Sequence, residues 1–362
     1  MKDLQHPRDA VDFGYTSWTV RGTWFSLRLP ARSLILSVVL FAVALAAVLV
    51  AITLGDYPIG IDQVLTVLTG GGAAFEQLVV LSWRAPVAIA AIVFGAMLGI
   101  GGAIFQSLTR NPLGSPDVIG FDAGSYTGVV VTMLVFGSRG YWSIAAAAIL
   151  GGAVTAGVVY ALSYRRGIQG FRLIIVGIGV SAMLGSLNAY LITRADVEDA
   201  MTVGFWGAGS LNRVTWQNLL PSLVIAAVIV AAAVLLSPAL SRLELGDDSA
   251  VTLGTRTGPA RAGLIVVGVA TVALVTAAAG PIGFIALVAP QLARRLTRTP
   301  GVSLLAAAAM GSALLGCAHL LALLIGAVHR PIPVGLLTVC LGGSYLIWLL
   351  IRETRSQMGA AR

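Results

Sequence analysis

The chain has 362 residues, of which 57% are hydrophobic and only 10% are charged, whereas a soluble domain carries about 25% charged residues. This composition excludes an ordinary soluble enzyme and is typical of a polytopic membrane protein. The formal net charge is +8, but the basic residues lie in short clusters between apolar runs, as orientation signals do, which disfavours nucleic-acid binding.

The first 32 residues are polar, and the apolar run after them lacks a convincing cleavage site. We therefore expect a cytosolic tail at 1–32 and an uncleaved first span. A helix that crosses the bilayer needs about 20 mostly apolar residues. The clear candidates are 33–54, 84–107, 117–136, 141–163, 171–193, 217–238, 302–327 and 333–351. Residues 33–352 are thus predicted to form one membrane domain, followed by a cytosolic tail at 353–362.

A polar turn, QSLTRNPLGSPDVIGFDAGS at 106–125, separates the second and third of these runs. Because a residue before proline avoids the helical conformation, Asn111 and Pro112 should end the preceding helix. Ser115 can cap the next helix, with Pro116 at its first position. The segment is predicted to be a stiff cytosolic hairpin. A simple connection would not need so many specific turn and capping residues, which favours contact with a partner.

The largest internal loop reads SRLELGDDSAVTLGTRTGPAR at 241–261. Asp247 and Asp248 suit the N-terminal end of a short helix, where negative charge is favourable. We interpret this loop as the docking element for a partner. A solvated connector without a partner is the alternative.

The stretch 262–293 carries no charge across its 32 residues. As one helix it would be about 48 Å long, beyond an apolar core of about 30 Å. If 262–293 crosses the membrane twice, 18 Lys and Arg residues lie inside and 5 outside, whereas a single crossing places 13 inside and 10 outside. The positive-inside rule therefore favours two crossings here and ten spans in all. The break contains Gly280, Pro281 and Gly283, which are candidates for a pathway-lining element because broken backbone at membrane depth must be covered by protein or line a cavity. A tight hairpin buried in the bundle is the alternative.

Two absences limit the source of energy. Lys2 is the only lysine, so the chain has no P-loop and is not by itself a P-loop ATPase. The spans carry few charges, whereas ion-coupled transporters usually place acidic or histidine residues there. Asp117 and Asp122 lie within the first two turns of their predicted helix, and His319 lies alone in the middle of 302–327. For His319 we favour a satisfied core histidine over a metal ligand. A partner must therefore supply energy, or transport is passive.

Five ordered segments resemble the FecCD-type permeases of bacterial ABC importers. These segments are RNPLGSPDVIG (110–120), FWGAGSLNRVTW (205–216), LGDDSAVTLG (245–254), GPIGFIALVAPQLARR (280–295) and PVGLLTVCLGG (333–343). The resemblance covers about 84–351. It implies the type II importer permease fold, which is all-α, has ten transmembrane helices and keeps both termini in the cytosol of a bacterial cell.

The resemblance also implies an activity and a set of partners. The family imports ferric siderophores, cobalamin or haem across the inner (plasma) membrane by alternating access, and we expect a ferric siderophore here. The permease would be no enzyme and would bind no metal or cofactor, since ATP and Mg belong to two ATPase subunits. A second permease subunit, identical or paralogous, and an external substrate-binding protein would complete the importer.

The resemblance assigns roles to individual residues. The segment that contacts the ATPase would include Leu245, Gly246, Asp247, Asp248, Ala250, Leu253 and Gly254. The cytosolic end of the pathway would include Asn111, Pro112 and Pro116. External arginines of the family meet acidic residues of the binding protein, and Arg84 and Arg330 are the best candidates here. Each of the two arginines has an interfacial anchor as its alternative role.

The sequence departs from the family pattern at two places. Gln291 replaces the histidine of the PHxxR segment, so the role of that imidazole is lost. His319 and Leu323 stand where an Asp and an Arg are common, which indicates a repacked ion pair. An ion-coupled secondary transporter and a membrane scaffold or receptor stay open as alternatives; the shortage of intramembrane acids opposes the first and the coupling segment opposes the second.

Overall fold

In this computed structural model the described residues, 17–21, 26–117, 120–164, 170–298 and 301–360, are almost entirely helical. The long helices are α1 (Ala31–Thr53), α4 (Ala85–Thr109), α5 (Phe121–Leu134), α6 (Tyr141–Ser163), α7 (Gly170–Arg194), α9 (Trp216–Glu244), α11 (Thr257–Ala279), α12 (Ile285–Thr297), α13 (Leu304–Val328) and α14 (Val334–Ala360). The short elements are α2 (Ile61–Leu68), α3 (Ala74–Gln77), the π-helix η1 (Leu78–Arg84), α8 (Val197–Gly207), the 3₁₀ helix η2 (Leu211–Arg213) and α10 (Asp247–Thr252).

Within the described residues, seven helices are long and apolar enough to cross a membrane. Each remaining predicted span also falls on a helix, namely α5, α12 and α14. Helix α5 has 14 residues and α12 has 13, so at 1.5 Å per residue each is only about 20 Å long. The all-α polytopic fold is confirmed, whereas the number of ten spans stays a prediction.

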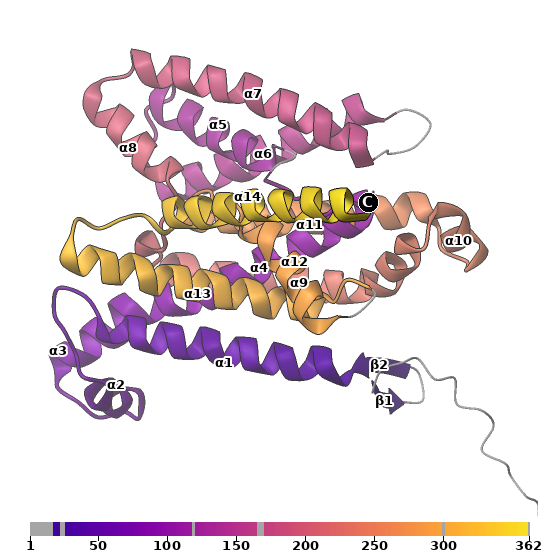
Figure 1. Cartoon of the computed structure of the whole chain (residues 1–362). Helices are drawn as coiled ribbons and strands as arrows, with labels where there is room; N and C mark the ends of the chain where they lie inside the picture. The colour runs from indigo at the N-terminus through magenta and orange to yellow at the C-terminus, as the bar shows by residue number, and fades with distance from the viewer. Residues whose placement is uncertain (1–16, 22–25, 118–119, 165–169, 299–300, 361–362) are drawn as a thin grey trace, which may run out of the picture.

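Helix α4 lies at the centre of the bundle (Figure 1) and packs against α1, α9, α11, α12 and α13. In the most apolar stretch of the segment that contains it, 78% of the residues are buried, against 33% in α1. The close approach depends on glycine. A Cβ atom built on Gly99 would overlap the carbonyl oxygen of Ala307, and one on Gly102 would overlap that of Ala286.

The two ends of the bundle carry different short elements (Figure 1). Helices α2, α3 and α8 lie at one end, which we call the α8 end. Helix α10, strands β1 (Ser17–Arg21) and β2 (Ser26–Pro30) and the end of α14 lie at the other, which we call the α10 end. The helices therefore run between two faces, and the short elements cover those faces.

The residues before α1 include a feature that the sequence did not predict. Strands β1 (Ser17–Arg21) and β2 (Ser26–Pro30) pair antiparallel, with Ser17 opposite Pro30 and Arg21 opposite Ser26. The predicted polar tail thus includes a hairpin that leads directly into α1, and the rest of that tail lies outside the described residues.

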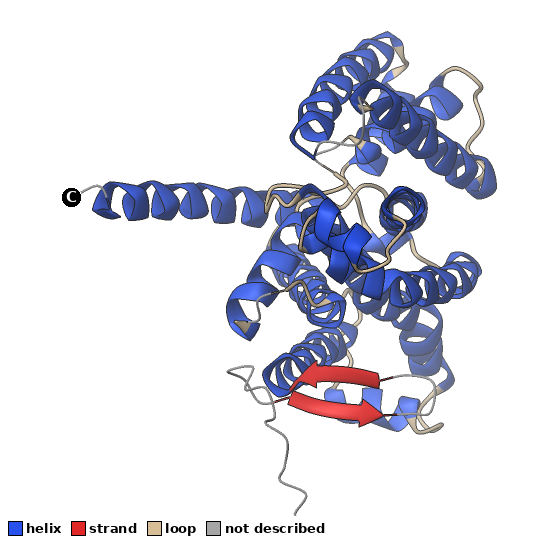
Figure 2. Cartoon of the chain, turned by 90° about the vertical axis from the view of Figure 1, so that its right-hand side faces the viewer, coloured by secondary structure: helices blue, strands red, loops and turns tan. Residues whose placement is uncertain are grey.

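Helix α14 departs from the bundle. Figure 2 shows it extending away from the other helices toward the C-terminus. Its contacts are with α12 and α13, and Leu336, Val339, Leu341 and Ile347 are exposed. One side of α14 is therefore open for a further helix or for lipid.

Candidate coupling and pathway sites

Helix α10 is a six-residue helix held between two glycines at the α10 end. Gly246 precedes it with φ 114° and Gly254 follows it with φ 79°, conformations that residues with a Cβ atom rarely adopt. Asp247 and Asp248 lie in its first turn, and Ala250 is fully buried as its anchor. All seven residues of the predicted ATPase-contacting segment are therefore in or beside one short helix.

The surface around α10 is apolar. Leu245, Val251 and Leu253 are exposed by 66%, 58% and 52%, although they lie at an end of the bundle where polar loops are expected. Exposed apolar patches of this kind typically mark protein interfaces. The arrangement fits a partner that covers α10.

Asp247 is bound within the chain. Its Oδ1 accepts hydrogen bonds from the Nη2 atoms of Arg110, at 2.9 Å, and Arg261, at 2.8 Å. Arg110 ends α4 in a left-handed conformation and also donates to the carbonyl oxygen of Leu243 at 3.1 Å. The coupling segment and the RNPLG segment, far apart in sequence, thus meet through these side chains.

Glu244 is a neighbouring residue that the sequence analysis missed. Its Oε1 accepts hydrogen bonds from the Ser107 hydroxyl of α4 and from the backbone N–H of Val302, before α13. The available signal was its position in LELGDD, three residues before Asp247 at the end of a long apolar run. Glu244 and Asp247 together connect the α10 region to three other helices.

The RNPLG segment forms the predicted turn after α4. Asn111 Oδ1 accepts from the backbone N–H of Leu113 at 2.9 Å, which closes an Asx-type turn. The carbonyl oxygen of Pro112 accepts from Gln291 Nε2 at 2.6 Å. The Gln291 Oε1 atom in turn accepts from the Tyr345 hydroxyl at 3.4 Å. Gln291 therefore joins the hairpin, α12 and α14 in place of the imidazole.

The start of α5 differs from the prediction. The helix begins at Phe121 after Gly120, whose φ is 96°, and not beside Pro116. Ser115 does not cap it, and the buried Ser115 Oγ has no hydrogen-bond partner among the described residues. Asp117 instead accepts from the backbone N–H of Phe284 at 2.9 Å, a contact 167 residues away in sequence. This tertiary contact replaces the local cap that the sequence favoured.

The Gly280–Gly283 break separates α11 from α12, as the sequence predicts. Gly280 and Phe284 have φ of 78° and 68°. The break packs against the segment after α8, where Ser210 donates its backbone N–H to the carbonyl oxygen of Ala279 at 2.7 Å. A Cβ atom on Gly209 would overlap the carbonyl oxygen of Pro281. The first half of the break is therefore covered by protein, while Gly283 is partly exposed.

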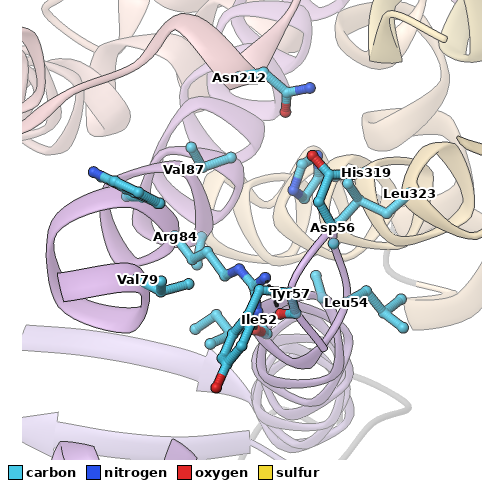
Figure 3. Close-up of a pocket in the computed structure, with 14 residues that line it drawn as sticks. Ile52, Leu54, Asp56, Tyr57, Val79, Arg84, Val87, Asn212, His319 and Leu323 are labelled. Atoms are coloured by element: carbon cyan, nitrogen blue, oxygen red, sulfur yellow. Dashed lines mark hydrogen bonds between the residues drawn. The ribbon is translucent and has the colours of Figure 1, made fainter. Parts of the chain in front are cut away.

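The α8 end contains a pocket lined by apolar and polar residues (Figure 3). Two adjoining cavities of about 320 and 410 Å³ share Asp56, Asn212, His319 and Leu323 among their lining residues. His319 is only 6% exposed, and its ring points into this pocket without a hydrogen bond to any described residue. The histidine is thus buried and faces a cavity, and its role as a satisfied core residue stays a prediction. The described residues contain no group of three or more possible metal ligands.

The two external arginines differ in their surroundings. Arg84 Nη1 donates to the Ile52 carbonyl oxygen at 2.7 Å and Nη2 donates to that of Tyr57 at 2.6 Å (Figure 3). Arg330 is exposed in the loop between α13 and α14. Arg84 therefore stabilises the chain that follows α1, whereas Arg330 makes no comparable hydrogen bond to the described residues.

Comparisons with known proteins agree on one family. The model of the FecCD transport family matches residues 41–352. The ferric enterobactin transport system permease protein FepG of Escherichia coli is 44% identical over 90% of this chain and 98% of its own length. The hemin transport system permease protein HmuU of Yersinia pestis is 32% identical over 78% of this chain and 86% of its own.

A solved structure is also similar. It shows an ABC transporter of the metal-chelate type in an inward-facing conformation, with a TM-score of 0.74 and 25% identity. The match covers 88% of this chain and 99% of that one. The similarity therefore extends over the whole bundle and is not confined to the five motifs.

Proposed function

The chain belongs to the FecCD transport family, and from this membership we propose that it is the permease subunit of an ATP-binding-cassette importer that carries a ferric siderophore into the cytoplasm. It is a membrane-embedded transport subunit and not an enzyme. The assignment of the substrate rests on one observation, the 44% identity to a ferric enterobactin permease along nearly the whole of both chains.

Haem is the second candidate substrate, because a hemin permease is 32% identical over 78% of this chain. Cobalamin, which the family resemblance includes, is the third. The pocket at the α8 end does not decide among these substrates.

The coupling role rests on α10. An exposed apolar surface of Leu245, Val251 and Leu253, with an acidic first turn, is suited to a groove on a soluble partner. We place the ATPase subunits there, and ATP and Mg belong to those subunits. Closure of the ATPases would then displace α10 and switch the side on which the pathway opens.

The remaining partners are placed on the open surfaces. The second permease subunit, either identical or a paralogue, would pack against α14, which extends away from the other described helices (Figure 2) and has exposed apolar residues. An external binding protein would dock at the α8 end. Arg330 is better placed than Arg84 to meet its acidic residues, because the Arg84 guanidinium already binds two carbonyl oxygens.

The substrate is tested in proteoliposomes that hold the complete importer, with its ATPase and binding protein. We expect ATP-dependent uptake of radiolabelled ferric enterobactin, with hemin and cobalamin at background. Preferred uptake of hemin or cobalamin would overturn the assignment of a ferric siderophore as the substrate. Absence of ATP-dependent uptake of all three would overturn the transport function.

A further inference from the structure

We propose that Asp247 is a positioning residue that ties α10 to the rest of this chain, while Asp248 is left to contact the ATPase. This division rests on the proposed function and refines it, because the sequence treats the two aspartates as equivalent members of one motif. Their surroundings in the structure are different.

The negative charge of Asp247 is already matched. Its Oδ1 lies 2.8 Å from Arg261 Nη2 and 2.9 Å from Arg110 Nη2. The Arg261 side chain is only 14% exposed, and its buried Nε has no partner among the described residues. Removing one member of a partly buried ion pair leaves an uncompensated charge. Arg261 therefore needs Asp247, although the Asp247 side chain itself is 51% exposed.

The same contacts join three helix ends. Arg261 belongs to the first turns of α11, and Arg110 is the left-handed residue that ends α4. Arg110 also binds the Leu243 carbonyl oxygen in the last turn of α9, where a positive charge is favourable. Asp247 is thus the point at which α10 is attached to α4 and α11.

Glu244 repeats this arrangement on the other side of Gly246. It binds Ser107 in α4 and the backbone N–H of Val302, just before α13. Gly246, with φ 114°, lies between the two carboxylates and gives α10 a joint to α9. Displacement of α10 would therefore act on the end of α4 and on α11 through the Asp247 side chain, while Glu244 holds the end of α9 to α4 and to the residues before α13.

Asp248 lacks such contacts. It is exposed in the first turn of α10, and no ion pair in the described part of the chain includes it. It lies beside the exposed apolar residues Leu245 and Val251. Asp248 is therefore the acidic residue that α10 presents outward, where a basic residue of the ATPase can meet it.

The test compares two isosteric variants, Asp247→Asn and Asp248→Asn, in the importer purified with its ATPase. Three quantities are measured: the affinity for the ATPase, the rate of ATP hydrolysis, and the number of substrate molecules imported per ATP. For Asp247→Asn we expect ATPase affinity within about twofold of wild type and at least a fivefold loss of import per ATP. For Asp248→Asn we expect about tenfold weaker ATPase binding with import per ATP unchanged.

Two further variants separate coupling from folding. Asp247→Glu keeps the charge and should restore most of the import per ATP. Arg110→Gln should uncouple as Asp247→Asn does, and the double variant should be no worse than either single one, since both act through one contact. Size-exclusion profiles and melting temperatures report whether each variant is folded.

The outcomes distinguish the two levels of the proposal. Equal loss of ATPase binding in Asp247→Asn and Asp248→Asn, with unchanged import per ATP, would overturn the division of roles and leave the proposed function intact. A wild-type chain that binds no ATPase would overturn the proposed function and this inference with it.

Discussion

At the scale of single residues, the Gln291 amide joins the hairpin after α4 to α12 and α14. Replacing it with leucine would remove the donor of the partly buried hydrogen bond to the Pro112 carbonyl oxygen, and such a hydrogen bond contributes about 0.5–1.5 kcal/mol. We expect a lower melting temperature for Gln291→Leu in detergent. Gln291→His, which restores the family residue, should keep most of the stability, because a neutral imidazole also has one donor and one acceptor. Equal melting of wild type and Gln291→Leu would contradict the bridging role.

Arg84 and Arg330 give a second prediction at this scale. Arg84→Gln removes a charged donor from the carbonyl oxygens of Ile52 and Tyr57, and hydrogen bonds to charged groups contribute about 1.5–3 kcal/mol. We expect reduced thermal stability and unchanged affinity for the external binding protein. Arg330→Gln should do the reverse. The two variants are compared by melting and by binding-protein titration, and weaker docking in Arg84→Gln at full stability would reverse the assignment.

The sequence predicted which residues form the coupling site but not how they are connected. Asp247 and Asp248 were adjacent acids with one expected role, because a local pattern carries no information on partners. The two aspartates differ because Asp247 binds Arg110 and Arg261, which are 137 and 14 residues away from it in the sequence. Glu244 was missed for the same reason, since its partners Ser107 and Val302 are on other helices.

At the scale of elements, the crossing of α4 and α13 depends on glycine. A Cβ atom on Gly99 would overlap the Ala307 carbonyl oxygen, and one on Gly311 would overlap that of Gly95. Backbone atoms cannot move aside as a flexible side chain can. Gly99→Val should therefore separate the helices and cost about 2 kcal/mol or more.

The measurement is the yield of monodisperse protein and its melting temperature. Gly157→Val is the matched control, because a Cβ atom on Gly157 of α6 would meet no atom within 4 Å. We expect the control to behave as wild type. A well-folded Gly99→Val variant would show that the close approach is not required.

The elements were predictable where proline, glycine and apolar length act locally. Gly280 and Pro281 predict the end of α11. The positive-inside rule predicts a second pass after it, and α12 does begin at Ile285. The start of α5 was not predictable, because the Asp117 side chain binds Phe284 and the helix begins four residues later, at Phe121. The β1–β2 hairpin also went unpredicted, since a two-stranded pair carries a weak sequence signal.

At the scale of the whole molecule, the bundle has few charges with which to use an ion gradient. Among the described residues, Asp122 is an acid within α5, one of the predicted spans, and its Oδ1 accepts from the Thr276 hydroxyl at 2.9 Å. Ion-coupled transporters depend on such residues as relays. The same residue therefore separates the ATP-driven importer from the secondary transporter.

The two mechanisms predict opposite results in proteoliposomes. An importer driven by α10 should concentrate the ferric siderophore only when ATP and the ATPase are present, and a proton or sodium gradient alone should give background uptake. Asp122→Asn should keep at least half of the ATP-driven uptake, because the asparagine side chain still accepts a hydrogen bond from Thr276. Uphill uptake without the ATPase, abolished by Asp122→Asn, would establish ion coupling. It would also remove the role of α10, since the energy would then enter through the spans and not through the Arg110–Asp247–Arg261 contact at the α10 end.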